Sequence, residues 1–426
     1  MSTARSWVVV LMLAAAVPAS AQDQDQSQSN QTPPDSRAAL LAAERDKKAT
    51  ELTPPQRPKL ERALYRYDDN EGALPFIFQT WHGFQLASGS FPAGAGTNFG
   101  VRFTRDLGRV RPANDLNRPN RAEIDALAAY STRGYSRGAV GLNLYRLGGA
   151  PVDVRVRAQH YEYPQEDFFG FGQDSLKDYR TNYLLRSTEA AAHVQWNPVR
   201  FLELAGGASY LTPRIGSGTD SRYPSTEELF NPARIPGFER QPDFLRGHAS
   251  VAIDWRDNPL HPHAGGRYGV QLAEYRDQDL DAYSFRKVAI DLQQYVPIPD
   301  RYRTIALHAA ATFSDPQSGN QMPFYFQPTL GGAQALRGFR EFRFQDNNSM
   351  LLTAEYRWEA WWALDGAVFV DAGQVAADRK DFKLRDFDVS YGFGFRFHSN
   401  SAFVARLDLA FSREGFIPLL RFEHAF

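Results

Sequence analysis

The chain has 426 residues, no cysteine and a formal net charge of −1. The absence of cysteine excludes disulfides, thiol catalysis and thiolate metal sites, and the near-zero charge gives no support to nucleic-acid binding. Hydrophobic residues make up 43% of the chain and aromatic residues 13%. A membrane β-barrel has such a moderate composition, because only alternate residues of each strand face lipid.

The first 21 residues have the features of a secretory signal peptide. Arg5 precedes an apolar stretch, 7–17, that is too short to span a bilayer as a helix, and residues 19–21 fit the small-x-small cleavage pattern. An uncleaved membrane anchor is the alternative, which we do not favour because no stop-transfer pattern follows. We therefore expect export through a cleaved signal peptide, with residues 1–21 removed.

Residues 22–73 are predicted to form a disordered periplasmic tether. Residues 22–31 are almost all Gln, Asp, Ser and Asn, which are too polar to build a core. The segment 38–48 can form a short helix, but prolines interrupt much of the remainder. No later segment holds about 20 consecutive apolar residues, the length that a membrane-spanning helix needs.

From residue 74 onward the sequence has a period of two, and we predict one barrel domain over 74–426. In 352–359, for example, apolar and polar side chains alternate strictly, which places them on opposite faces of a strand. Alternation alone also fits a soluble sandwich, but the number and length of the strands favour a membrane barrel. We predict an all-β fold, a sixteen-stranded antiparallel transmembrane β-barrel, with strands at 75–87, 96–107, 123–133, 137–147, 151–163, 180–197, 200–211, 246–256, 266–276, 282–295, 302–313, 348–359, 363–371, 387–397, 402–411 and 417–426.

The connectors between these strands alternate in length. Three long ones, at 164–179, 212–245 and 314–347, all follow odd-numbered strands, whereas most connectors after even-numbered strands are short. Short periplasmic turns and long outer loops are typical of bacterial outer-membrane barrels. The final strand carries Phe422 and Phe426, and this aromatic terminus resembles the signal that such barrels present to the barrel assembly machinery during biogenesis.

Four short motifs then occur in order along the predicted strands and loops. They are Asp-Trp-Arg-Asp-Asn-Pro at 254–259, Leu-Arg-Gly-Phe at 336–339, Phe-Val-Asp-Ala-Gly at 369–373 and Tyr-Gly-Phe-Gly-Phe-Arg at 391–396. Each motif is common alone, but their order and strand positions together resemble the BamA/TamA family of outer-membrane assembly proteins, also called the bacterial surface antigen family. The resemblance covers roughly residues 74–426.

The resemblance implies that the long loop folds into the barrel lumen. Arg337 of the loop would then meet Asp371 on strand thirteen, with Gly338 and Phe339 shaping the loop tip and Gly373 completing the strand motif. The chemistry agrees, because a guanidinium can grip a carboxylate through two parallel hydrogen bonds. Phe369 lies two residues before Asp371 and therefore faces the same, inward side of the strand, so we expect it beside the pair. The alternative is an ordinary surface arginine in a mobile loop.

Two features bear on how such a barrel would work. The assembly proteins of the family carry periplasmic POTRA domains, and residues 22–73 are too short and too polar to supply one, so we expect a barrel-only member. Pro75 and Pro418 lie near the starts of the first and last strands, which meet when the barrel closes. Proline removes a backbone donor, so we hypothesise a weak seam that opens sideways into the bilayer. The alternative is that these prolines only mark the starts of the two strands and have no role in opening.

Other chemistry finds little support in the sequence. His261 and His263 flank Pro262 in a predicted turn, but we find no third ligand nearby and expect a structural turn with no metal. A hydrolase would need a Ser-His-Asp arrangement on one face, and His160 and His308 are isolated. We expect no catalytic residue and no cofactor.

We therefore expect a non-enzymatic, monomeric protein of the bacterial outer membrane that assists insertion or translocation. Its expected partners are lipopolysaccharide and phospholipid, the assembly machinery, and an unfolded outer-membrane protein or a lipid as substrate, with no nucleic acid. The alternatives are a passive pore or structural surface antigen and, less favoured, an outer-membrane hydrolase.

Overall fold

The computed structural model describes residues 82–87, 91–92, 94–109, 121–298, 303–361, 364–398 and 403–421. The chain divides into two compact units, Met1–Tyr65 and Arg66–Phe426, and every described residue belongs to the second. The predicted signal peptide and tether, and the residues Pro75, Phe422 and Phe426, lie outside the described residues.

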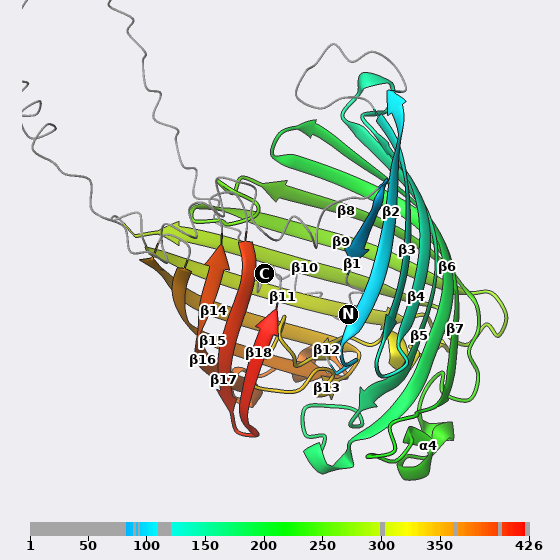
Figure 1. The fold of residues 1–426 in the computed structure, drawn as a ribbon. Coiled ribbons are helices and arrows are strands. Elements are labelled where there is room, and N and C mark those ends of the chain that lie inside the picture. The colour runs from blue at the N-terminus through cyan, green and yellow to red at the C-terminus, as the bar shows by residue number, and fades with distance from the viewer. Residues whose placement is uncertain are drawn as a thin grey trace, which may run out of the picture. The chain divides into compact units, whose positions relative to one another are not determined.

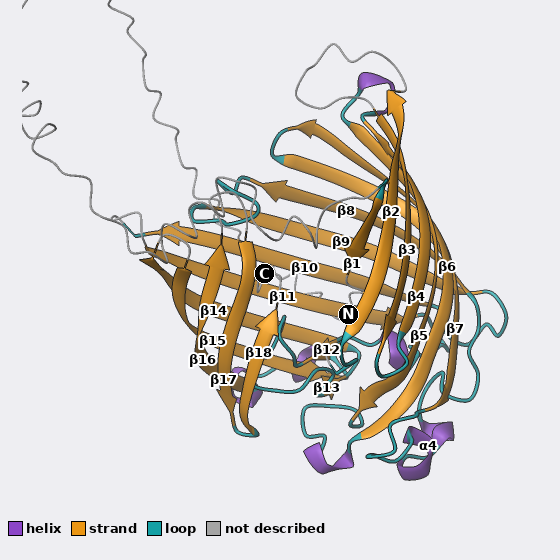
Figure 2. Ribbon diagram, viewed as in Figure 1, coloured by secondary structure: helices purple, strands orange, loops and turns teal. Residues whose placement is uncertain are grey.

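The described chain is almost entirely β-structure, with one sheet of sixteen strands in which each strand is antiparallel to its neighbours. The sheet curves around a central space, the lumen (Figures 1 and 2). This confirms the predicted sixteen-stranded antiparallel fold. The strands are β1 Phe84–Ala87, β2 Asn98–Arg109, β3 Arg121–Ser131, β4 Ser136–Tyr145, β5 Val152–Phe168, β6 Thr181–Val199, β7 Leu202–Ser217, β8 Phe244–Asp254, β9 Gly265–Asp277, β10 Phe285–Pro297, β11 Arg303–Pro316, β14 Asn348–Trp361, β15 Leu364–Ala376, β16 Asp388–His398, β17 Phe403–Ser412 and β18 Gly415–Arg421.

Few other elements interrupt the sheet. A two-stranded hairpin, β12 Thr329–Leu330 with β13 Phe344–Gln345, lies in the connector between β11 and β14, and a short helix, α4 Thr226–Leu229, lies between β7 and β8. Brief 3-10 turns complete the connectors. No helix in the described part of the chain is long and apolar enough to span a membrane.

The two faces of the sheet differ in polarity, as the period of two predicts. On β15 the outward side chains of Val368 and Val370 are 44% and 48% exposed, whereas the inward side chains of Phe369 and Asp371 are 3% and 0% exposed. Large exposed hydrophobic side chains recur in this way on most of the sixteen strands. An apolar outer face and a polar inner face are the arrangement of a barrel surrounded by lipid.

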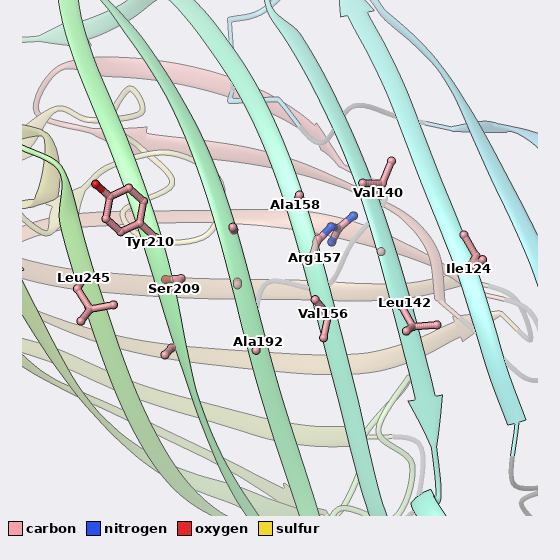
Figure 3. Close-up of a pocket in the computed structure, with 14 residues that line it drawn as sticks. Ile124, Val140, Leu142, Val156, Arg157, Ala158, Ala192, Ser209, Tyr210 and Leu245 are labelled. Carbon is pink, nitrogen blue, oxygen red and sulfur yellow. The ribbon is translucent and has the colours of Figure 1, made fainter. Parts of the chain in front are cut away.

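A shallow apolar groove marks this outer face over β3 to β8 (Figure 3). Exposed Ile124, Val140 and Val156 form one side of it, and Tyr210 and Leu245 form the other. Small alanine side chains on β6 and β7 form its floor. A lipid acyl chain suits such a surface, because the groove offers almost no polar group.

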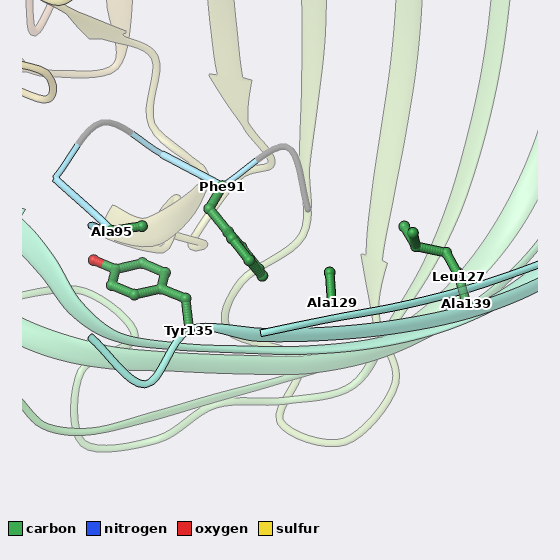
Figure 4. Close-up of a cluster of buried hydrophobic side chains, with 6 residues drawn as sticks. All are labelled: Phe91, Ala95, Leu127, Ala129, Tyr135 and Ala139. Atoms are coloured by element: carbon green, nitrogen blue, oxygen red, sulfur yellow. The ribbon is translucent and has the colours of Figure 1, made fainter. Parts of the chain in front are cut away.

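On the inner face, residues of the β1–β2 connector pack against the wall. Phe91 lies over β3 and β4 with its ring 6.0 Å from that of Tyr135, next to Leu127 and Ala129 (Figure 4). The Tyr135 hydroxyl donates to the carbonyl oxygen of Gln165 at 2.8 Å. Phe91 and Ala95 of this connector therefore pack on the lumen side of the wall.

Candidate functional site

The connector between β11 and β14, residues 317–347, packs against the inner face of the sheet. Its hairpin residues Leu330 and Phe344 form a buried apolar cluster with Leu336 and Phe339 of the same connector and with inward side chains of β14 and β15. The rings of Phe339 and Phe344 lie 5.1 Å apart. Loop residues that are fully buried against strand residues place this loop inside the lumen.

Arg337 fastens the tip of this loop to β15. Its Nε and Nη2 donate to Oδ2 and Oδ1 of Asp371 at 2.9 and 2.6 Å, and its backbone N–H donates to Oδ2 at 3.2 Å. Thr353 and Ser390 donate to the same carboxylate from the neighbouring strands, at 3.0 and 3.1 Å. Asp371 of β15 is thus held by the two neighbouring strands, β14 and β16, in addition to the loop.

The remaining nitrogen of Arg337 extends the contact into a charge network. Nη1 donates to Glu355 on β14 at 2.7 Å, and Glu355 also accepts from Arg396 on β16 at 2.9 Å. Arg396 in turn donates to Asp408 on β17 at 2.5 Å. All five charged side chains are at most 3% exposed, so the network links the loop to four consecutive strands away from water.

Two further arginines lie at the margins of the network. Arg406 on β17 donates to Asp408 at 3.1 Å and to the carbonyl oxygen of loop residue Ala333 at 2.6 Å. Arg357 on β14 donates to Glu355 at 2.8 Å. Asp371, Glu355 and Asp408 therefore each face at least one guanidinium, and a second loop residue is fastened by its backbone.

The residues around Arg337 are packed so closely that Gly338 and Gly373 have no room for a side chain. Its guanidinium carbon lies 3.3 Å from the centre of the Phe369 ring, a cation–π contact. A Cβ on Gly338 would lie 2.7 Å from the carbonyl oxygen of Phe411, and a Cβ on Gly373 would lie 2.9 Å from the Leu330 side chain. Both glycines allow the loop and strand backbones to approach closely.

The structure brings six of the predicted residues together: Arg337, Gly338, Phe339, Phe369, Asp371 and Gly373. Sequence reasoning did not assign Glu355, Arg396 or Asp408 to the site. Their inward parity was visible in the alternation, but which of many inward charges converge depends on the path of the loop. Pro418, predicted near the start of the last strand, is the fourth of seven residues in β18 and pairs with Leu409.

The expectation that no third ligand lies near His261 and His263 is wrong. Asp365 at the start of β15 places its Oδ2 3.1 Å from His261 Nε2, and the ligand atoms of the three residues lie within 4.8 Å of one another. The sequence does not reveal this group, because the turn that carries the histidines and the strand that carries Asp365 are far apart in the chain. Among the described residues, these side chains form the one cluster suited to a metal ion.

Two solved structures are similar to this chain. BamA from Haemophilus ducreyi lacking POTRA domains 1–3 matches with a TM-score of 0.56 and 14% identity, covering 79% of this chain and 69% of that one. CdiB from Escherichia coli matches with a TM-score of 0.48 and 14% identity, covering 81% of this chain and 61% of that one. At this identity the likeness to BamA supports the barrel fold.

No curated protein sequence matches the chain. A family model does: the Omp85 superfamily domain matches residues 167–415, more than half of the chain, and spans the loop, the charge network and strands β6 to β17. Together with the sixteen-stranded sheet, this supports an outer-membrane location. The chain belongs to the Omp85 superfamily.

Proposed function

We propose that this protein is a non-enzymatic outer-membrane barrel that assists the insertion or translocation of a protein or lipid. The observation that carries the proposal is the lumen loop itself, which is held by the buried contact of Arg337 with Asp371 and Glu355. Ordering a long loop costs conformational entropy, and a loop that fills the lumen narrows the path open to solutes, which disfavours a passive pore.

The position of the network supports a lateral route. The buried charges tie together β14, β15, β16 and β17, so this part of the wall is stiff. In the described part of the chain, the next strand, β18, pairs only with β17, and Pro418 within it has no backbone N–H to donate. A stiff wall beside a last strand that contains a proline favours opening at that edge, where membrane lipid and a substrate segment would meet.

The proposed partners follow from this route. Lipopolysaccharide and phospholipid would contact the apolar outer face, and an unfolded outer-membrane protein or a lipid would be the substrate. BamA, whose barrel fold is shared, is the comparison for such a role. We propose that the protein acts as a monomer after its own insertion by the barrel assembly machinery.

Depletion in the source bacterium tests the proposal. We expect loss of particular outer-membrane proteins from the membrane proteome, or phospholipid in the outer leaflet, with recovery on expression of the unmodified chain. Arg337→Ala should fail to restore either property. Arg385→Ala is the matched control, because the Arg385 side chain is 78% exposed and contacts only Asp386 among the described ion pairs. An unchanged proteome and unchanged lipid asymmetry after depletion would reject the proposal.

A passive pore is the second candidate, and one observation favours it. A polar cavity of about 610 Å³ lies beside the loop in the lumen, lined by Lys287, Asp291 and Gln293 among others. Conductance in planar bilayers separates the two candidates. The proposed function predicts little conductance from the unmodified barrel and larger, less steady currents from Arg337→Ala. A large, steady conductance in the unmodified protein would favour the pore.

A further inference from the structure

We propose that His261, His263 and Asp365 form a binding site for a divalent transition-metal ion of the Zn²⁺ type. The group lies where the β8–β9 turn, residues 255–264, reaches the first residues of β15. His261 Nε2 and Asp365 Oδ2 are 3.1 Å apart, and the ligand atoms of all three residues lie within 4.8 Å of one another. This inference is independent of the proposed function.

The spacing suits tetrahedral coordination. Zinc binds imidazole nitrogen and carboxylate oxygen at about 2.0–2.2 Å, which puts ligand atoms of one tetrahedral ion about 3.4 Å apart. The His261–Asp365 contact, at 3.1 Å, already has nearly this separation, and no ligand-atom separation in the group exceeds 4.8 Å. Two imidazoles with one carboxylate leave a fourth position for water, as in three-ligand zinc sites.

The turn holds the two histidines in place before any ion binds. Oδ1 of Asp257 accepts from the backbone N–H groups of Asn258, His263 and Ala264 at 2.9–3.1 Å. The backbone N–H of Asp257 also donates to the carbonyl oxygen of Ala264 at 3.0 Å. Pro262 fixes the backbone φ angle between the two histidines. Metal binding therefore orders little additional backbone.

A second contact orients one imidazole for coordination. Nδ1 of His263 lies 3.0 Å from the carbonyl oxygen of His261. Because a carbonyl oxygen only accepts, Nδ1 carries the proton and Nε2 presents its lone pair. Histidine ligands of protein metal sites commonly donate their other ring N–H to a backbone carbonyl in this way, which fixes the tautomer and the ring orientation.

The surroundings accept one small ion. A cavity of about 10 Å³ is lined by the three ligands together with Thr304, Arg357 and other side chains, and this volume is close to that of one water-sized sphere. Arg357 brings a positive charge to the wall, and its Nε donates to Glu355 at 2.8 Å, so Glu355 offsets part of that charge. Asp365 is 4% exposed, which strengthens its attraction for a cation.

A bound ion would link the turn to the strand that carries the loop contact. Asp365 has the same inward parity on β15 as Asp371, and the turn also approaches β11, because Thr304 donates to the carbonyl oxygen of His263 at 3.5 Å. The metal would therefore link the β8–β9 turn to β15 at the end of the barrel where the connectors are short. Ions that prefer oxygen ligands, such as Mg²⁺, suit this site poorly, because two of its three ligands are imidazoles.

Isothermal titration of the folded full-length protein, made without a polyhistidine tag and treated with chelator, tests the proposal. We expect one equivalent of Zn²⁺ to bind and Mg²⁺ not to bind. His261→Gln, His263→Gln and Asp365→Asn should each weaken Zn²⁺ binding by more than about tenfold, the lower range seen even for outer-sphere partners. The double variant His193→Gln/His248→Gln is the control: these rings also lie close, with 3.1 Å between nitrogens.

The control pair lacks a third clustered ligand among the described residues, so its removal should leave Zn²⁺ binding unchanged. X-ray absorption of the Zn²⁺-loaded unmodified protein should show imidazole scattering with N or O ligands at about 2.0–2.2 Å, which decides the matter if a variant does not fold. The proposal is overturned if the unmodified protein binds no Zn²⁺, if the ligand variants bind it equally well, if only the control loses it, or if imidazole scattering is absent.

Discussion

Arg337 makes contacts that no other residue type reproduces at its position. Two of its nitrogens grip Asp371, the third reaches Glu355, and its flat face lies on Phe369. Arg337→Ala would leave the buried Asp371 without its guanidinium and would remove one of three guanidiniums that contact Glu355, so we expect a loss of about 3–5 kcal/mol in the free energy of unfolding. Urea titration of the barrel in lipid vesicles measures this loss.

Arg337→Lys should recover part of that stability, because lysine restores the charge but not the bidentate contact. Arg385→Ala, at an exposed position, should change stability by no more than about 0.5 kcal/mol. Equal unfolding midpoints for Arg337→Ala and Arg385→Ala would show that the loop contact contributes nothing to stability.

Gly338 provides a steric test of the same contact. A Cβ there would lie 2.7 Å from both the carbonyl oxygen of Phe411 and the Cβ of Ser390, and backbone atoms of a paired strand cannot move aside easily. We expect Gly338→Ala to cost about 1–3 kcal/mol, measured by the same titration. Gly138→Ala is the control, because a Cβ at Gly138 meets no atom within 4 Å. Similar losses in the two variants would contradict close packing at the loop tip.

At this scale the sequence alone predicted only part of the site. The pairing of Arg337 with Asp371 came from a resemblance between motifs, and the inward position of Phe369 came from its parity with Asp371. Glu355, Arg396 and Asp408 converge only because β14, β16 and β17 curve around the same loop. Parity says which face a side chain occupies, but it does not say which of its neighbours a folded-in loop will bring to it.

At the scale of elements, the period of two predicted all sixteen sheet strands, because alternation persists wherever one face is apolar. The ends were less accurate on the long-connector side. β5 was predicted to end at 163 and continues to Phe168, and β7 was predicted to end at 211 and continues to Ser217. Beyond the bilayer both faces of a strand meet loops or water, so the alternation that marks a strand fades before its hydrogen bonds end.

The seam between the first and last strands is the element on which the proposed function depends. A cysteine placed at Gln85 of β1, scanned against cysteines at positions 417–421 of β18, would identify pairs that crosslink. The protein has no native cysteine, so these would be its only thiols. We expect a closed crosslink to remove the ability to complement the depletion phenotype, because a locked edge cannot open.

Ala410→Cys with Ile417→Cys is the matched control, because these residues are register partners between β17 and β18. Both strands lie on one side of the proposed opening, so this crosslink should leave complementation intact. If a locked seam also complements fully, the barrel does not work by lateral opening.

For the whole molecule, function requires that the apolar face of the sheet meet lipid and the polar face enclose the lumen. Neighbouring residues near the middle of β9 test this: Val270 is 38% exposed on the outer face, whereas Gln271 is on the inner face with Arg267, which lies near Glu203 and Asp291. Arginine on the lipid face near the bilayer midplane costs about 2–4 kcal/mol. We therefore expect Val270→Arg to lower the yield of folding into vesicles, measured by heat-modifiable gel mobility, and Gln271→Arg to fold nearly as well as the unmodified chain. If Gln271→Arg lowered the folding yield and Val270→Arg did not, the polar face of the sheet would meet lipid. The loop that carries Arg337 would then lie outside the barrel.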